Sequence, residues 1–182
     1  MIVDVGGDTN LTYLHLPRTG GSWVRSQLVK VGKRITTWGH KLEDIERRGT
    51  VFTTIRHPIG WYPSFWAIFG RHTNRIKSEV FPSIADISDD DFNQWASKVC
   101  KAHPGLLADT YRKMLPCEFI CTEYLTVGFP KWIASHTKEK IAGLPPINMT
   151  PNKMRPAWDV GVAEMVVEAE QGAIDLWSYA DN

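Results

Sequence analysis

The feature that most constrains the fold is a β-prone run, a glycine turn and a helical stretch in direct succession near the N-terminus. Residues 11–16 (LTYLHL) have strand character and stop at Pro17, whose missing N–H makes it a poor continuation of a central strand. Residues 18–21 (RTGG) then form a turn. Residues 22–31 place apolar side chains near helical spacing, and Gly32 ends the helix. The sequence therefore predicts a strand, a glycine loop and a helix.

Further strand candidates alternate with helix candidates along the chain. The strand candidates are residues 34–38, 50–55 (TVFTTI) and 118–121 (EFIC). The helix candidates are residues 41–48, a helix from Pro58, a helix that starts at the capping sequence 88–91, and a tail, residues 160–179, with one apolar stripe. This alternation predicts an α/β, three-layer fold with a central, mostly parallel sheet flanked by helices and a P-loop-like unit at the N-terminus.

Size and charge narrow the class of protein. A chain of 182 residues, 43% of them hydrophobic, can bury one sizeable core, so we expect one domain over residues 1–182. A formal net charge of +1 argues against a protein whose main task is to coat nucleic acid or an anionic membrane. The sequence has no signal-peptide pattern, no run long enough to span a bilayer and no CxxC pair among its three cysteines, so we expect a cytoplasmic protein with reduced thiols. Nothing in the sequence determines its oligomeric state.

The glycine turn has the chemistry of an anion site. A glycine loop between a strand and a helix directs several backbone N–H groups into one concavity, and the helix N-terminus adds partial positive charge. Residues 17–22 (PRTGGS) add a cation and two hydroxyls, but they lack the G-K-[ST] end of the nucleoside triphosphatase loop. The alternative is a tight strand-to-helix turn that needs glycine only for its positive φ.

Two motifs resemble those of a known family. Residues 15–23 (HLPRTGGSW) are similar to the 5′-phosphosulfate loop of the sulfotransferases that use 3′-phosphoadenosine 5′-phosphosulfate (PAPS), usually P-K-[ST]-G-[TG]-[ST]-[WS] after a strand. Residues 56–64 (RHPIGWYPS) resemble the family's second motif, an arginine at a strand end with a proline two residues later and a serine eight residues later. Residues 122–125 (TEYL) resemble its Y-E-D-L segment, and residues 148–158 occupy the place of its late cofactor loop. Arginine stands where the first motif more often has lysine, and the chain is shorter than most members.

The resemblance implies roles for specific residues. Arg18 and the N–H groups of the following residues would hold the 5′-phosphosulfate; these residues are Thr19, Gly20, Gly21 and Ser22. Arg56 and Ser64 would hold the 3′-phosphate. Trp23 would pack against the adenine, or equally would serve ordinary helix-to-sheet packing. Lys153 and Arg155 would close over the nucleotide's phosphates, with a solvated basic loop as the alternative.

The implied activity is transfer of a sulfuryl group from PAPS to a hydroxyl or amine of a small-molecule or carbohydrate acceptor, which releases 3′-phosphoadenosine 5′-phosphate. No metal is required, because protein cations and backbone dipoles can stabilise the charge of the leaving phosphate, and Arg18 suits this role. His40 is the expected general base, since it follows a strand candidate and a glycine and precedes a helix; Glu123 is the second candidate. The alternative for His40 is a helix cap or an exposed side chain.

Two rival functions stay open at this level. One is a P-loop kinase that uses ATP, although the loop lacks the G-K-[ST] end. The other is a nucleotide-binding module without catalysis, which a short chain allows. Binding without turnover would distinguish this module from an enzyme.

Overall fold

The chain is described by a computed structural model over residues 2–4, 10–32, 34–36, 48–71, 79–138, 141 and 156–181. It forms two compact units, mainly Met1–Arg56 with Met114–Met149, and His57–Lys113 with Thr150–Ala180. The single domain expected from chain length stays a prediction. Within the described ranges, no helix has both the length and the apolar character needed to cross a membrane.

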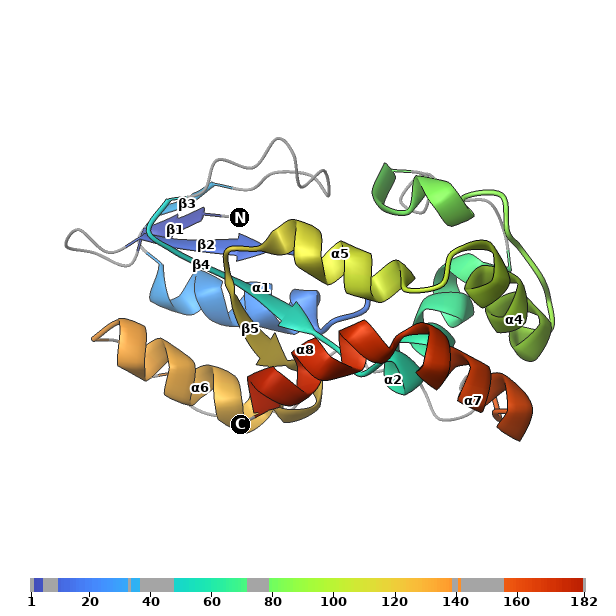
Figure 1. The fold of residues 1–182 in the computed structure, drawn as a ribbon. Helices are drawn as coiled ribbons and strands as arrows, with labels where there is room; N and C mark the ends of the chain where they lie inside the picture. The colour runs from blue at the N-terminus through green and yellow to red at the C-terminus, as the bar shows by residue number, and fades with distance from the viewer. Residues whose placement is uncertain are drawn as a thin grey trace. The chain divides into compact units, whose positions relative to one another are not determined.

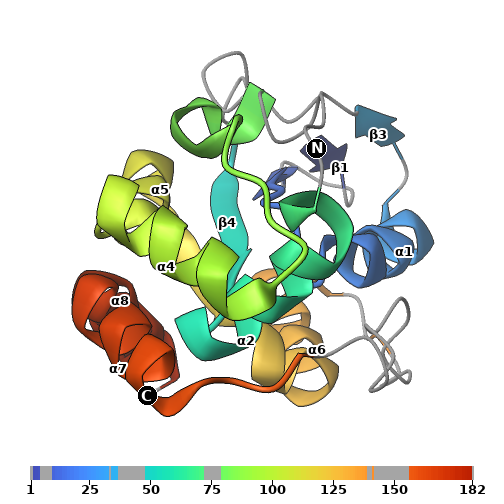
Figure 2. The ribbon, with the colours of Figure 1, turned by 90° about the vertical axis from the view of Figure 1, so that its right-hand side faces the viewer.

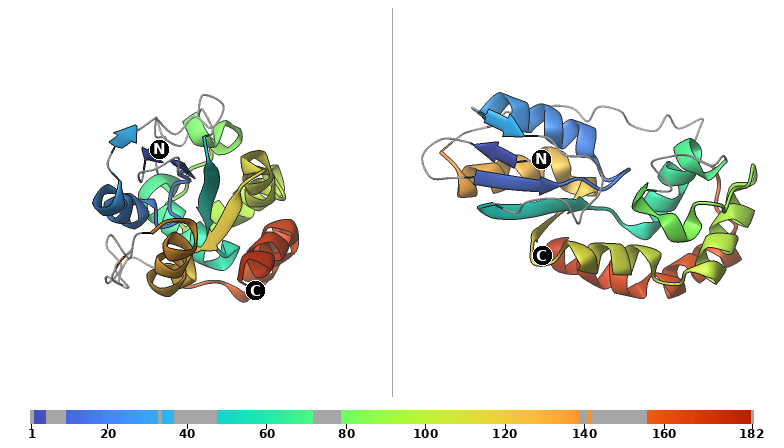
Figure 3. Two further views of the ribbon diagram at one scale, coloured as in Figure 1. Left: turned by 90° about the vertical axis from the view of Figure 1, so that its left-hand side faces the viewer. Right: turned by 90° about the horizontal axis from the view of Figure 1, so that it is seen from above.

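The first unit contains a five-stranded sheet in the order β3-β1-β2-β4-β5 (Figure 1). Its strands are β1 (Ile2–Asp4), β2 (Asn10–Leu14), β3 (Arg34–Thr36), β4 (Thr50–Ile55) and β5 (Glu118–Cys121). β2, β4 and β5 are parallel, with Leu14 opposite Thr53 and Ile55 opposite Cys121. β2 and β4 point the same way in the right-hand view of Figure 3. β1 is antiparallel to both of its neighbours. The fold is therefore α/β with a small parallel sheet, which confirms the expected class.

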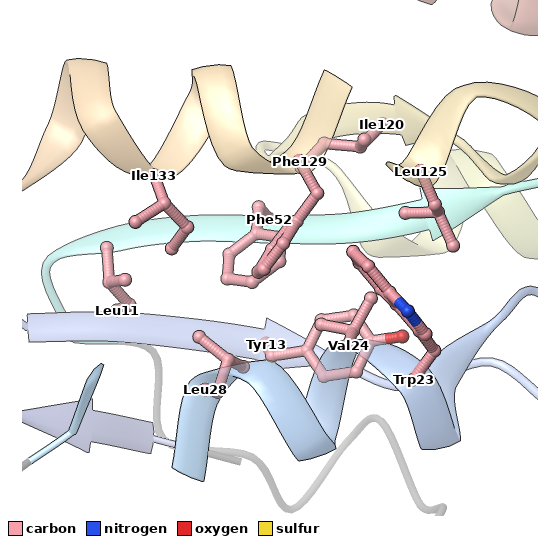
Figure 4. Close-up of a cluster of buried hydrophobic side chains, with 10 residues drawn as sticks. All are labelled: Leu11, Tyr13, Trp23, Val24, Leu28, Phe52, Ile120, Leu125, Phe129 and Ile133. Atoms are coloured by element: carbon pink, nitrogen blue, oxygen red, sulfur yellow. The ribbon is translucent and has the colours of Figure 1, made fainter. Parts of the chain in front are cut away.

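Two helices cover one face of this sheet, α1 (Gly21–Val31) and α6 (Leu125–His136) (Figure 3, left). They enclose an apolar cluster with β2, β4 and β5 (Figure 4), formed by Leu11, Tyr13, Trp23, Val24, Leu28, Phe52, Ile120, Leu125, Phe129 and Ile133. The Trp23 ring meets Phe129 edge to face at 5.6 Å, and Phe52 lies 4.3 Å from Trp132, both distances between ring centroids. Aromatic contacts of this kind hold α1, the sheet and α6 together. The third layer expected from the sequence stays a prediction.

The second unit is helical. Its helices are α2 (Pro58–Phe65), a π-helical turn (Trp66–Gly70), a 3₁₀ turn (Pro82–Ile84), α4 (Phe92–Ala102), α5 (Leu106–Met114), α7 (Val160–Ala169) and α8 (Gln171–Asp181). α4 begins where the capping sequence predicts, because the Asp91 carboxylate accepts a hydrogen bond from the N–H of Gln94 at 2.8 Å. α4 and α7 lie side by side (Figure 2). Asn93 joins them: its amide donates to the carbonyl of Ala157 at 3.2 Å and accepts from the N–H of Asp159 at 3.0 Å.

The tail is not the single helix that its apolar stripe indicates, because it breaks at Glu170 into α7 and α8. The Glu170 side chain is fully buried, and the hydroxyl of Tyr62 donates to it at 2.8 Å. The N–H groups of Leu107 and Ala108 also donate to the carboxylate, at 3.1 and 3.3 Å. These N–H groups belong to the first turn of α5 and have no acceptor within that helix. Glu170 thus caps α5 from the junction of α7 and α8.

Glu170→Ala should lower the free energy of unfolding by about 2–4 kcal/mol, because a buried hydroxyl and two helical N–H groups would lose their acceptor. Urea denaturation measures this change. Glu168→Ala on α7, at an exposed carboxylate, is the matched control and should change stability little. Equal effects of the two substitutions would contradict the capping role.

The same carboxyl group also predicts a dependence on pH. Burial is the main cause that raises the pKa of Glu170. The folded state therefore binds this proton more tightly than the unfolded state, and the group's contribution to stability falls as pH rises from the ordinary glutamate range through the raised pKa. Glu170→Gln should remove that component of the pH profile.

Candidate functional site

The candidate site lies where three parallel strands end. Since β2, β4 and β5 are neighbours and parallel, their carboxyl ends share one edge of the sheet. The segments that leave this edge are residues 15–20 after β2, Arg56 after β4 and the 3₁₀ turn Thr122–Tyr124 after β5. Ligands of open parallel sheets bind at such an edge.

The loop after β2 has an unusual backbone conformation. Arg18 and Gly20 both have positive φ, 68° and 81°, in the left-handed region. Gly20 is the N-cap of α1 and has no side chain to cap the helix, and the N–H groups of Trp23 and Val24 donate to the Gly20 carbonyl at 3.0 and 3.1 Å. Gly21 and Ser22 occupy the first helical positions, where N–H groups have no acceptor within the helix. The loop and the helix start therefore offer backbone donors and partial positive charge to an anion.

The glycines of the loop are closely packed. A Cβ added at Gly20 would collide with the Cδ1 atom of Leu125 on α6. A Cβ added at Gly21 would collide with the imidazole of His15, which also stacks on Tyr13 at 5.9 Å between ring centroids. A side chain at either glycine would have to displace its neighbour, and the positive φ of Gly20 also favours glycine. His15 packs against the loop, in agreement with a structural role.

A chain of hydroxyl groups holds the loop to β4. The Thr19 hydroxyl is buried and donates to the carbonyl of Leu16 at 2.8 Å, so it must accept from the Thr54 hydroxyl at 3.0 Å. Thr54 in turn accepts from the Tyr13 hydroxyl at 2.8 Å. Burial raises the pKa of Tyr13, so this phenol stays protonated at neutral pH and can donate. The hydroxyl of Thr19, which the sequence analysis counted with the loop's polar groups, thus faces inward, whereas Ser22 is exposed.

The two arginines of the motifs come together at this edge. The Arg56 guanidinium donates through Nη1 to the Arg18 carbonyl at 3.2 Å. Its Nε atom also lies 3.9 Å from Oε1 of Glu123, an ion pair at the ends of adjacent strands β4 and β5. Both arginines are half-buried, and burial lowers the pKa of Arg18, although a guanidinium remains charged at neutral pH. The Arg56 side chain therefore contacts the backbone of the loop at Arg18.

Thr122 is the residue that sequence reasoning missed. Its hydroxyl lies 2.9 Å from the carbonyl of Thr19 and 2.8 Å from the carbonyl of Ile55, so it connects the loop, β4 and β5. The sequence feature that could have indicated Thr122 is its position in the TEYL segment, directly after a predicted strand. Residue type alone could not reveal its partners.

Two further residues that the motifs assign to the ligand, Trp23 and Ser64, lie in described parts of the chain. Trp23 is only 2% exposed and packs in the core, so the structure shows its packing role. Ser64 is buried in α2 of the second unit, whereas Arg56 ends the first segment of the first unit, and their pairing stays a prediction. His57 acts as the N-cap of α2 by accepting from the N–H of Ile59 at 3.3 Å. The expected base and late-loop cations, His40, Lys153 and Arg155, lie outside the described residues.

Comparisons of the chain with models of known protein families, with curated proteins and with solved structures found no match.

Gly20→Ala should destabilise the protein by at least about 2 kcal/mol, because it places a side chain at positive φ and displaces Leu125. Gly128→Ala is the matched control within the same unit. Gly128 lies inside α6 with open space at its Cβ position, so alanine there should be neutral or should stabilise by up to about 1 kcal/mol. Chemical denaturation of both variants tests the comparison, and the reverse order of stabilities would show that the loop conformation does not require glycine.

Proposed function

We propose that the protein is a sulfotransferase that uses PAPS as donor. The observation that carries the proposal is the position of its two motifs: the glycine loop leads from β2 into α1, whose N-cap is Gly20, and Arg56 follows the adjacent parallel strand β4 and contacts the loop. In the P-loop-like architecture proposed here, this edge receives the anionic part of the donor.

The donors proposed for this edge suit the anionic groups of PAPS. Backbone N–H groups at a helix start and guanidinium groups favour compact anions with several oxygen acceptors. Arg18 and the N–H groups of residues 19–22 would hold the 5′-phosphosulfate. Arg56, together with Ser64, would hold the 3′-phosphate. The planar fork of donors on arginine suits such tetrahedral anions.

The chemistry follows from these roles. PAPS supplies the sulfuryl group. Arg18 and the loop N–H groups stabilise negative charge on the phosphate that leaves. Arg56 and Thr122 hold the carbonyls of Arg18 and Thr19, and so fix the loop backbone, before the ligand binds. His40 is the proposed base that takes the proton from the acceptor's hydroxyl or amine, and Glu123 is the second candidate. Glu123 lies at the same edge as Arg56, so its carboxylate has a cationic partner.

Adenosine 3′,5′-bisphosphate, the product after sulfuryl transfer, should raise the melting temperature of the protein by roughly 5–10 °C at a hundred times its dissociation constant, because binding at that level stabilises the folded state by about 2.7 kcal/mol. ATP with magnesium lacks the 3′-phosphate and should raise it much less. Scanning fluorimetry measures both shifts. Equal stabilisation by ATP would instead support a kinase.

Substitutions at Arg56 and Ser64 test the proposed 3′-phosphate site. Arg56→Ala should weaken binding of the bisphosphate by about ten- to a hundredfold, since a charge-assisted contact contributes about 1.5–3 kcal/mol, and Ser64→Ala should weaken it less. Arg48→Ala, at an exposed arginine before the opposite end of β4, is the control. If calorimetry finds neither Arg56→Ala nor Ser64→Ala changing the affinity, the assignment of the 3′-phosphate site is wrong.

A further inference from the structure

Thr122 belongs to neither of the two motifs but contacts the loop of the first one. Thr122 is the first residue after β5, and its hydroxyl lies within hydrogen-bond distance of two carbonyls, those of Thr19 in the loop and Ile55 at the end of β4. A threonine hydroxyl has one hydrogen, so the two carbonyls share it. Its methyl carbon lies 3.5 Å from the position that a Cβ on Gly20 would take. Both branches of this side chain therefore face the loop.

Because a peptide unit is rigid, a side chain that holds its carbonyl also sets the direction of its N–H group. The loop's peptide bonds are trans, and a trans peptide unit directs its N–H opposite to its C=O. Since Thr122 holds the carbonyl of Thr19, the N–H of Gly20 in the same peptide unit points away from Thr122. Arg56 acts in the same way on the preceding peptide unit: it holds the carbonyl of Arg18, and the N–H of Thr19 points away from Arg56.

The Thr122 contact acts on the peptide unit that precedes Gly20, next to a residue with unusual backbone freedom. Gly20 can populate both positive and negative φ at little cost, so its own residue type does not select the observed conformation. The Thr19 side chain is fixed by the hydrogen bonds of its hydroxyl with the Leu16 carbonyl and the Thr54 hydroxyl. The directions of the Arg18 and Thr19 carbonyls depend on Arg56 and Thr122, which donate hydrogen bonds to them. An anion-binding loop gains affinity when its donors are fixed before the ligand arrives.

We infer that Thr122 is a positioning residue for the 5′-anion of the ligand: its hydroxyl holds the Thr19 carbonyl and thereby directs the Gly20 N–H to the anion. The role rests on the proposed function, because it assigns the loop to the 5′-phosphosulfate. Arg56 has a charge of its own for the ligand, whereas Thr122 acts through the backbone alone. Ligands with and without a 5′-phosphate therefore separate the contribution of Thr122 from that of Arg56.

The test compares two probes by calorimetry, adenosine 3′,5′-bisphosphate and adenosine 3′-monophosphate, with the whole chain. The ratio of their affinities isolates the part that the 5′-phosphate contributes. Thr122→Val should reduce this ratio by about five- to tenfold, which corresponds to the loss of one hydrogen bond, and should leave the affinity for the 3′-monophosphate unchanged. Thr122→Ser, which keeps the hydroxyl, should restore the ratio.

The matched control is Thr137→Val, because the Thr137 hydroxyl also donates to a backbone carbonyl, that of Ile133 at 2.9 Å, at the far end of α6. It should leave the ratio at the wild-type value. A general loss of stability would weaken both probes together, so it would not imitate the expected result. Should Thr122→Val fail to fold, Thr122→Ala replaces it in the same comparison.

The outcomes separate this inference from the proposed function. A wild-type protein that binds neither probe, or both equally, would overturn the proposed function and the role of Thr122 with it. A wild-type protein that prefers the bisphosphate, with the preference unchanged in Thr122→Val or not restored in Thr122→Ser, would overturn the role of Thr122 alone.

Discussion

The connection between three parallel strand ends is the interaction on which the rest of the site depends. Parallel pairing of β2, β4 and β5 brings their carboxyl ends to one edge, but pairing alone does not determine the path of the loop. That path depends on contacts from side chains to backbone carbonyls. Thr19 bonds back to Leu16, Arg56 holds Arg18, and Thr122 holds Thr19 and Ile55 at once. The contacts to the carbonyls of Arg18 and Thr19 also direct the N–H groups of the same peptide units away from Arg56 and Thr122.

The apolar core anchors the segments that follow these strand ends. α1 begins directly after the loop and packs through Trp23 against Phe129 of α6, while α6 follows the 3₁₀ turn that contains Thr122 and Glu123. The loop and the turn are thus each continuous with a helix that is anchored in the same apolar cluster. Burial of this cluster stabilises the positions of the polar groups at its edge. Leu125 contributes directly, because it lies against Gly20 and limits the loop to a residue without a side chain.

The sequence predicted elements whose signals are local. β4 and β5 have the predicted bounds because TVFTTI and EFIC are compact runs between turns, and α4 begins at its predicted cap. The three-residue strand β1 has too little pattern to be recognised. The break in the tail at Glu170 and the contacts of Thr122 were missed for a different reason. Their partners, Tyr62 and Leu107 in one case and Thr19 and Ile55 in the other, are distant in sequence. Only tertiary structure brings such residues together.

The measurement that decides the position of the site is a crystal structure of the protein with adenosine 3′,5′-bisphosphate. We expect the 5′-phosphate within hydrogen-bond distance of the N–H groups of residues 19–22 and beside Arg18, and the 3′-phosphate beside Arg56 and Ser64. We also expect that the Thr122 hydroxyl stays on the Thr19 carbonyl when the ligand is bound. A bisphosphate bound away from the loop after β2, or no bound nucleotide at saturating concentration, would contradict the account.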